Sequence, residues 1–240
     1  MKRLKILHTS DTHLGTDWRP ELEEKALQAI VNGAVTLAAD AVVIVGDVFD
    51  HARVSDSVLE FFVEQIGSID IPVVVLPGNH DLYDSKSLYK RHEFNNKPDN
   101  LHIMTDNEGE TITFADLDLD VWGRAMLSHT PQFQPIKGMP PKNKHRWLVA
   151  LAHGHFHFET DTEVRSSPIY PLELANATCD YLALGHWERY VDVSQGDVKA
   201  VYSGSPLGAL QSNDMVSVIL ADLDPNNGVI ANLCQLPMVD

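Results

Sequence analysis

The sequence predicts an α/β protein built around a parallel sheet. Continuous β-branched runs, of which AVVIV (41–45) is the clearest, alternate with segments of helical periodicity, and the apolar runs end in Asp, His or Asn. Uninterrupted apolar strands are typical of parallel sheets that are covered on both faces. At 240 residues and 44% hydrophobic content, the chain predicts one well-packed domain over residues 1–240, with no separate capping domain.

The first third of the chain predicts strand, helix, strand, helix, strand. LKILHT (4–9) is an apolar strand. Residues 20–39 carry apolar side chains at three- and four-residue steps, which indicates a helix, and residues 58–66 indicate a second one. After each helix comes a buried strand, first 41–45 and then 72–76. This order predicts parallel strands joined by right-handed crossovers.

The rest of the chain is richer in strands. Residues 129–145 are rich in Pro and Lys and predict an exposed loop. Short strands are expected at LHIMTD (101–106), ETITFAD (110–116) and LDLDVWG (117–123), and buried ones at RWLVALAH (146–153) and DYLALGH (180–186). Strands of a closing sheet are expected at KAVYSGSP (199–206), MVSVILADL (215–223) and GVIANLCQL (228–236).

The charge of the chain restricts its partners. Lys and Arg total 18 against 34 Asp and Glu, a formal net charge of −16. A protein that holds long nucleic acid through its phosphates usually has a basic face, so the charge favours a small or transiently held substrate, or partners that supply the grip. No apolar run approaches a membrane span, and the two cysteines form no C-x-x-C, so we expect a reduced, cytoplasmic protein without a membrane.

Polar side chains follow the predicted buried strands. In parallel α/β sheets, ligands bind beyond the carboxyl ends of the strands, so these side chains are expected to converge. Mixed oxygen and nitrogen donors suit divalent metals, and their number exceeds the needs of one ion, which favours two metals that share a carboxylate. The candidates are Asp11 and His13 after the first strand, Asp47 after the second, Asn79, His80 and Asp81 after the third, and His153 and His186 after the later ones. Asp50, also after the second strand, is interpreted as a turn or supporting residue.

Local spacing agrees with a metal site. Asp11 and His13 are two residues apart, so both side chains of an extended segment face one ion. Gly46 and Gly78 allow sharp turns and a close approach of backbone to the site. Asp47 has two carboxylate oxygens and is the candidate to bridge two cations.

D-x-H, G-D-x-x-D and G-N-H-D in this order resemble the calcineurin-like metallophosphoesterase superfamily. GDVFD (46–50), DYLALGH and VYSGSP (201–206) further resemble the nuclease subunit of SbcCD-type DNA repair exonucleases. The resemblance covers most of the chain and implies a four-layer α/β/β/α sandwich. It also implies a metal-dependent phosphoesterase with two divalent ions, Mn²⁺ first and Mg²⁺, Fe or Zn²⁺ as alternatives, and an ATPase partner subunit.

The resemblance also assigns ligands. It implies one metal bound by Asp11, His13, Asp47 and the residue at 188, and another bound by Asp47, Asn79, His153 and His186. The superfamily has a G-H-x-H segment just before Y-x-G-S, and here that segment is GHWE, so Glu188 stands where the last histidine is expected. Two interpretations stay open: Glu188 ligates a metal, which would favour harder ions, or it points away and that site is weak or empty.

The stretch LAHGHFHFE (151–159) also contains a G-H-x-H pattern. Taken literally, Gly154 to His157 is a G-H-x-H, but no strand separates it from His153. We therefore interpret His153 as the single ligand of this stretch. His155 and His157 are interpreted as solvated or supporting residues, which leaves open a contact with substrate.

The predicted reaction is hydrolysis of a phosphoester by a hydroxide bridging the two cations. By resemblance His80 binds no metal and acts on the phosphate or the leaving oxygen, and Asp81 orients it. We expect a DNA exonuclease-like phosphodiesterase. The alternatives are a phosphodiesterase or phosphatase acting on a small nucleotide-type substrate, and a non-catalytic scaffold that keeps the fold. The sequence leaves the oligomeric state open.

Overall fold

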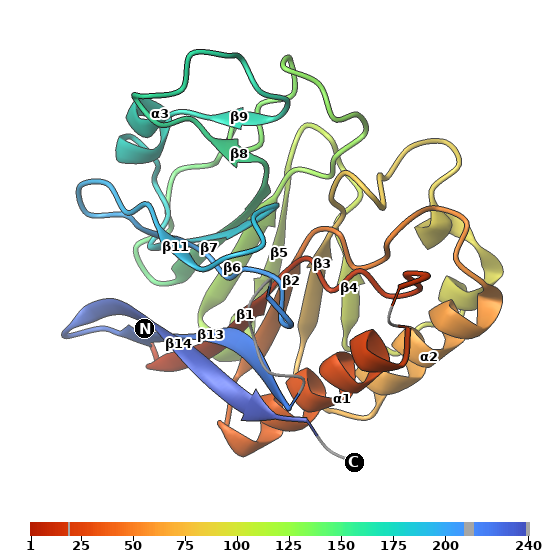
Figure 1. Cartoon of the computed structure of the whole chain (residues 1–240). Helices are drawn as coiled ribbons and strands as arrows, with labels where there is room; N and C mark the ends of the chain where they lie inside the picture. Colours follow the sequence, from red (N-terminus) through yellow and green to blue (C-terminus); the bar gives the residue numbers. More distant parts are fainter. Residues whose placement is uncertain (19, 209–213, 239–240) are drawn as a thin grey trace.

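The computed structural model describes residues 1–18, 20–208 and 214–238, and two six-stranded sheets form its centre (Figure 1). The predicted α/β class is confirmed. The first sheet runs in the order β14 (Gly228–Pro237), β13 (Met215–Asp224), β1 (Leu4–Thr9), β2 (Ala41–Val45), β3 (Val73–Leu76) and β4 (Leu101–Ile103). The second runs in the order β11 (Val191–Asp192), β12 (Lys199–Tyr202), β10 (Tyr181–Gly185), β7 (Trp147–His153), β6 (Leu119–Gly123) and β5 (Glu110–Phe114).

The strands that precede the candidate ligands are parallel within each sheet. β1 pairs with β2, and β2 with β3, all in parallel register. In the second sheet β10 lies parallel to β7, with Gly185 opposite His153. The carboxyl ends of these strands therefore meet at one end of the molecule.

Three apolar layers hold the sheets and helices together. On the outer face of the first sheet, α1 (Pro20–Thr36) and α2 (Asp56–Gly67) share one core with its strands. Between the sheets, the inward side chains of β1, β2, β7 and β10 form a second core. The third core covers the outer face of the second sheet, where Leu174 of α3 (Pro171–Ala175) packs.

The outer layer over the second sheet is mostly irregular. The resemblance implies a helical layer there, and the described chain places only the five-residue α3 and loops over that face. Residues 124–146 contribute to this covering and contain no helix or strand. Prolines at 131, 135, 140 and 141 explain this, because proline lacks the N–H that helices and sheets need.

The prediction that the last three strands form one closing sheet is wrong. β12 joins the second sheet, whereas β13 returns to the first and runs antiparallel to β1, with Leu4 opposite Leu223. β14 then extends the first sheet as a hairpin partner of β13. Apolar alternation predicts a strand but does not specify its neighbour, so the tertiary structure decides the partner. Also unpredicted is the small parallel pair of β8 (His155–Phe156) and β9 (Pro168–Ile169).

A buried histidine links the two sheets. His8 in β1 is fully buried, as expected for a packed position inside the first strand. Its Nδ1 lies 2.8 Å from the Tyr181 hydroxyl and its Nε2 lies 3.2 Å from the Leu184 carbonyl oxygen, both in β10. Burial lowers the pKa of His8 to about 3, so the ring is neutral. Because a carbonyl only accepts, Nε2 carries the hydrogen and Nδ1 accepts from the tyrosine.

None of the helices in residues 1–18, 20–208 and 214–238 is at once long and apolar enough to cross a membrane.

Candidate metal centre

The predicted ligands converge from both sheets. Asp11 and His13 follow β1, and Asp47 follows β2. Asn79 follows β3, while His153 ends β7 and His186 follows β10. Side chains from strands far apart in the sequence therefore meet where the two sheets present their carboxyl ends together.

One cluster consists of Asp11, His13 and Asp47. One ligand atom from each of these side chains lies within 4.8 Å of the other two. Asp11 and Asp47 are almost completely buried. Two carboxylates and an imidazole at this separation match the donor set of a divalent cation.

A second cluster shares Asp47 with the first. Its members Asp47, His153 and His186 also lie within 4.8 Å of one another. Asn79 Oδ1 lies 3.1 Å from His153 Nε2 and 2.9 Å from His186 Nδ1, so the amide oxygen faces both rings. His153 Nδ1 donates to the Val45 carbonyl oxygen at 2.9 Å. That bond leaves Nε2 to face the cluster, the usual arrangement around a metal-binding histidine.

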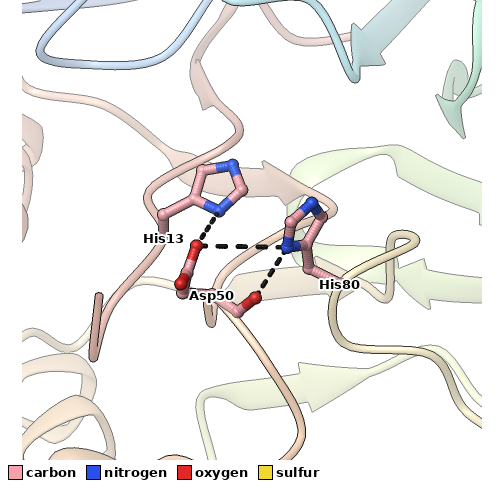
Figure 2. A group of neighbouring side chains, drawn as sticks. All are labelled: His13, Asp50 and His80. Carbon is pink, nitrogen blue, oxygen red and sulfur yellow. Dashed lines mark hydrogen bonds and ion pairs between the residues drawn. The ribbon is translucent and has the colours of Figure 1, made fainter. Parts of the chain in front are cut away.

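A third group brings His13, Asp50 and His80 together, as Figure 2 shows. His13 Nδ1 lies 3.0 Å from Asp50 Oδ1, and His80 Nδ1 donates to the Asp50 backbone oxygen at 2.6 Å. Asp50 therefore contacts a predicted ligand through its side chain and the predicted catalytic histidine through its backbone. The sequence indicated a turn or supporting role for Asp50, and these contacts are of the supporting kind.

Four predicted ligands adopt an unusual backbone conformation. Asp11, His13, Asp47 and His186 have φ angles of 53°, 47°, 51° and 103°. Positive φ is uncommon outside glycine, and strained residues of this kind cluster at functional sites. The segment from Asp11 to His13 is therefore turned, and the prediction that it is extended is wrong. The turns after β1, β2 and β10 bring these side chains to the joint carboxyl ends of the two sheets.

Two glycines make the close packing of the site possible. A Cβ on Gly46, where φ is +82°, would lie 2.0 Å from His153 Nδ1. A Cβ on Gly78 would lie 2.3 Å from Asp47 Oδ1. Both distances are shorter than any real contact, so the predicted close approach of the backbone at Gly46 and Gly78 is observed.

The electrostatics of the centre favour a bound cation. Burial, with the nearby Asp47 carboxylate, raises the pKa of Asp11 to about 7 against the lowering effect of His153. Burial would also raise the pKa of Asp47, but the positive charge of His153 at 3.3 Å outweighs burial and holds it well below its usual range. A proton on His153 thus neutralises Asp47, and a metal would take the place of that proton.

The Asp81 side chain stabilises the turns after β2 and β3 instead of orienting the His80 ring. The sequence interpretation made Asp81 the residue that orients the His80 ring, but the Asp81 carboxylate bonds elsewhere. It accepts from Gly78 N at 2.6 Å, Val48 N at 2.8 Å and the Tyr89 hydroxyl at 2.7 Å. Asp81 thereby joins the turns after β2 and β3, and the orientation of His80 comes from the carbonyl of Asp50.

His129 is a member of the site that the sequence did not single out. Its ring centroid lies 5.3 Å from that of His186. Its Nδ1 lies 3.0 Å from Ser167 Oγ, which ties it to the turn before β9. A single histidine in a proline-rich loop carries no motif, so only the tertiary contact reveals it.

The remaining histidines of LAHGHFHFE lie outside the three clusters found among the described residues. His155 pairs with Asp161 at 3.2 Å, and His157 Nε2 lies 3.1 Å from the Glu163 carbonyl oxygen. Both rings are therefore engaged within the loop that follows β7.

Glu188 is exposed and belongs to none of the clusters in the described part of the chain. Its role as fourth ligand of the Asp11 cluster stays a prediction. We expect Glu188→Ala to weaken binding of one Mn²⁺ by about tenfold or more. Loss of a group that only supports a ligand already costs about tenfold at other metal sites, and loss of a ligand should cost at least as much. Metal counting by mass spectrometry after dialysis measures this, with the exposed Glu163→Ala as control. Unchanged occupancy would leave that ion with Asp11, His13 and Asp47.

Replacing Asp11 by asparagine is expected to stabilise the metal-free protein while weakening its metal binding. The folded pKa of Asp11, about 7, lies above its unfolded value of 3.8, so the ionised group destabilises the fold as pH rises above 3.8. At pH 8 asparagine removes this cost, and it tolerates positive φ. A gain of about 1 kcal/mol corresponds to a rise in Tm of about 2–4 °C at this chain length. An unchanged or lower Tm in chelator would contradict this account.

Taken together, two packed sheets with carboxylate, amide and imidazole donors at their joint strand ends define a candidate site for divalent metal ions. The chain matches the model of the calcineurin-like phosphoesterase family over residues 4–190. It therefore belongs to the calcineurin-like phosphoesterase family.

Relatives of known sequence include nuclease subunits. The chain is 27% identical to the SbcD subunit of the SbcCD nuclease of Bacillus subtilis over 85% of its own length, and it spans 62% of the length of that relative. It is 34% identical over 88 residues to the DNA double-strand break repair protein Mre11 of Methanosarcina acetivorans, which covers 33% of this chain and 14% of that protein.

Solved structures share the fold at low sequence identity. A dimetal phosphatase from Danio rerio superposes with a TM-score of 0.62 at 11% identity, over 99% of this chain and 97% of the other. TT1561 of Thermus thermophilus superposes with a TM-score of 0.58 at 14% identity, over 96% and 99% of the two chains.

Proposed function

We propose that this protein is a phosphodiesterase of the DNA exonuclease type that uses two divalent metal ions. The observation that carries the proposal is the pair of ligand clusters joined by Asp47. Two donor sets that share one carboxylate are what a two-metal phosphoesterase requires. The similarity to SbcD of the SbcCD nuclease supports the choice of a phosphodiester in DNA as substrate.

Each of the two clusters would bind one cation. Asp11 and His13, with Glu188, would hold one cation, and Asn79, His153 and His186 would hold the other. Asp47 would contact both. When bound, the cations supply Lewis-acid activation of water and of the phosphate. Oxygen donors combined with imidazoles suit Mn²⁺, Mg²⁺, Fe and Zn²⁺ alike, and the resemblance makes Mn²⁺ the first choice among them.

His80 is the proposed proton carrier. Its Nδ1 hydrogen is held by the Asp50 carbonyl, so Nε2 is the nitrogen that remains for substrate. That nitrogen accepts a proton when the ring is neutral and donates one when it is charged. The His80 side chain is 43% exposed, so it is reachable from solvent. It would stabilise the phosphate charge or protonate the leaving oxygen.

A small nucleotide is the second candidate substrate. The net charge of −16 favours it, because a long nucleic acid gains most of its binding energy from basic side chains. The DNA proposal therefore includes a partner subunit, an ATPase by resemblance, that would supply the basic side chains needed to hold the DNA. We also propose a cytoplasmic location, which fits the two free cysteines, Cys179 and Cys234.

The test is a substrate panel with purified protein and Mn²⁺. We expect hydrolysis of bis-p-nitrophenyl phosphate and of single-stranded DNA, and slower hydrolysis of p-nitrophenyl phosphate. Activity on cyclic nucleotides or monoesters with none on DNA would select the small-molecule alternative. If no phosphoester is cleaved with Mn²⁺, Mg²⁺, Fe²⁺ or Zn²⁺, the protein is a scaffold that keeps the fold.

A further inference from the structure

An aromatic surface adjoins the metal centre on the side of the second sheet. Trp187 directly follows the proposed ligand His186. The ring of His155 lies 5.4 Å from the Trp187 ring, and that of Phe158 lies 5.5 Å from it. We call these three side chains, His155, Phe158 and Trp187, the aromatic wall. Two of them come from LAHGHFHFE and none is a proposed metal ligand.

The base of the wall is rigid. Trp187 stacks on Tyr202 with ring centroids 4.8 Å apart and an angle of 18° between the planes. Tyr202 is fully buried, and its hydroxyl donates to the Gly154 carbonyl oxygen at 2.8 Å. The indole therefore rests on a fixed partner that is itself tied to the turn after His153.

Phe158 and His155 are also held in place. Asp161 accepts from the Phe158 backbone N–H at 2.9 Å, and the same oxygen lies 3.2 Å from His155 Nε2. His157 N–H donates to the Ile169 carbonyl oxygen at 2.9 Å, which joins the segment to β9. Ordering of these rings thus requires no substrate, so little conformational entropy is lost when one binds.

The wall is accessible and close to the reacting centre. Phe158 is 37% exposed, and His155 and Trp187 are partly exposed. Trp187 directly follows His186, and His155 lies two residues after His153, so the wall is joined to two of the proposed ligands by the chain itself.

We propose that the aromatic wall binds the base of a nucleotide whose phosphodiester lies at the metal centre. The proposal rests on the proposed phosphodiesterase function and names its substrate class as nucleotidic. Stacking between a base and an aromatic ring needs no positive charge and tolerates any base. It is thus a means of binding that a chain with a net charge of −16 can use. Phosphate contacts alone would be opposed by the same charge.

The experiment compares two diesters with one leaving group, thymidine 5′-(p-nitrophenyl) phosphate and methyl p-nitrophenyl phosphate, with Mn²⁺. The wild type is expected to prefer the thymidine diester. Phe158→Ala and Trp187→Leu are each expected to lower kcat/KM for that diester about tenfold, chiefly through KM, and to leave the methyl diester nearly unchanged. Val164→Ala, 66% exposed in the same loop, is the matched control and should behave as wild type.

The outcomes separate this inference from the proposed function. If both diesters are hydrolysed and the variants change the two rates equally, or change neither, the aromatic wall is not a base site. The proposed phosphodiesterase function then still stands. If the wild type cleaves neither diester, the proposed function fails, and binding is then measured by quenching of tryptophan fluorescence with the dinucleotide TpT. Quenching that disappears in Trp187→Phe supports the base site, and absence of quenching in the wild type overturns it.

Discussion

Asp47→Asn is expected to abolish activity and to reduce the bound Mn²⁺ from two ions per chain to one at most. Asp47 is the single side chain common to both ligand clusters, so its loss weakens both sites at once. Each cation supplies several kcal/mol of charge stabilisation in two-metal hydrolysis, so a loss of at least about a thousandfold in kcat/KM follows. Mass spectrometry of the dialysed protein and hydrolysis of bis-p-nitrophenyl phosphate measure the two effects.

Asparagine is the suitable replacement for Asp47. It accepts the backbone N–H of His80 at Oδ1 as aspartate does, and it tolerates the φ of 51° at this position. The fold should therefore survive, as circular dichroism will show. Asp116→Asn, at an exposed position beyond β5, controls for the loss of one negative charge. A variant that still binds two ions and turns over would remove Asp47 from the bridging role.

His80→Ala is expected to lose activity and to keep both metal ions. The ring hydrogen-bonds to the Asp50 backbone and packs edge-on against His13 at 4.8 Å between ring centroids. In the proposed mechanism it meets the substrate rather than a cation. Removal of a positioned proton carrier costs about a hundredfold to ten-thousandfold in kcat. The fall should be smaller for a diester with p-nitrophenolate as leaving group, because that group departs without a proton.

A pair of measurements separates the two roles open to His80. Metal content is compared between His80→Ala and the exposed control His145→Ala, and rates are compared between bis-p-nitrophenyl phosphate and DNA. Equal metal content with a larger loss on DNA supports proton transfer to the leaving oxygen. Loss of an ion would move His80 into the metal shell, beside His13 and Asp50, which already lie within reach of one ion.

Much of the site was predictable because its residues follow strands. D-x-H, G-D and G-N-H-D each come directly after an apolar run, and the structure brings Asp11, His13, Asp47 and Asn79 together where those runs end. These side chains converge because the strands of a parallel sheet end on the same side of the sheet. The strand positions themselves were also predicted well, since apolar runs mark buried strands.

Other features depend on contacts that no local pattern encodes. The pairing of β13 with β1, the short β8–β9 pair and the contact of His129 with His186 join segments far apart in the chain. Asp81 was expected to orient His80, yet its buried carboxylate bonds backbone N–H groups of both turns and Tyr89. A buried carboxylate takes the donors within its reach, and a sequence does not show which these are.

The sequence by itself determined the fold class, the end of the sheet where the candidate ligands converge and the kinds of donor atom found there. These follow from hydrophobic periodicity and from residues directly after strands, both of which are local. The tertiary structure decided that Asp50 contacts both His13 and His80, that His129 joins the site, and that two side chains of LAHGHFHFE form an aromatic wall with Trp187. Such contacts depend on how two sheets pack, and packing is a property of the whole chain.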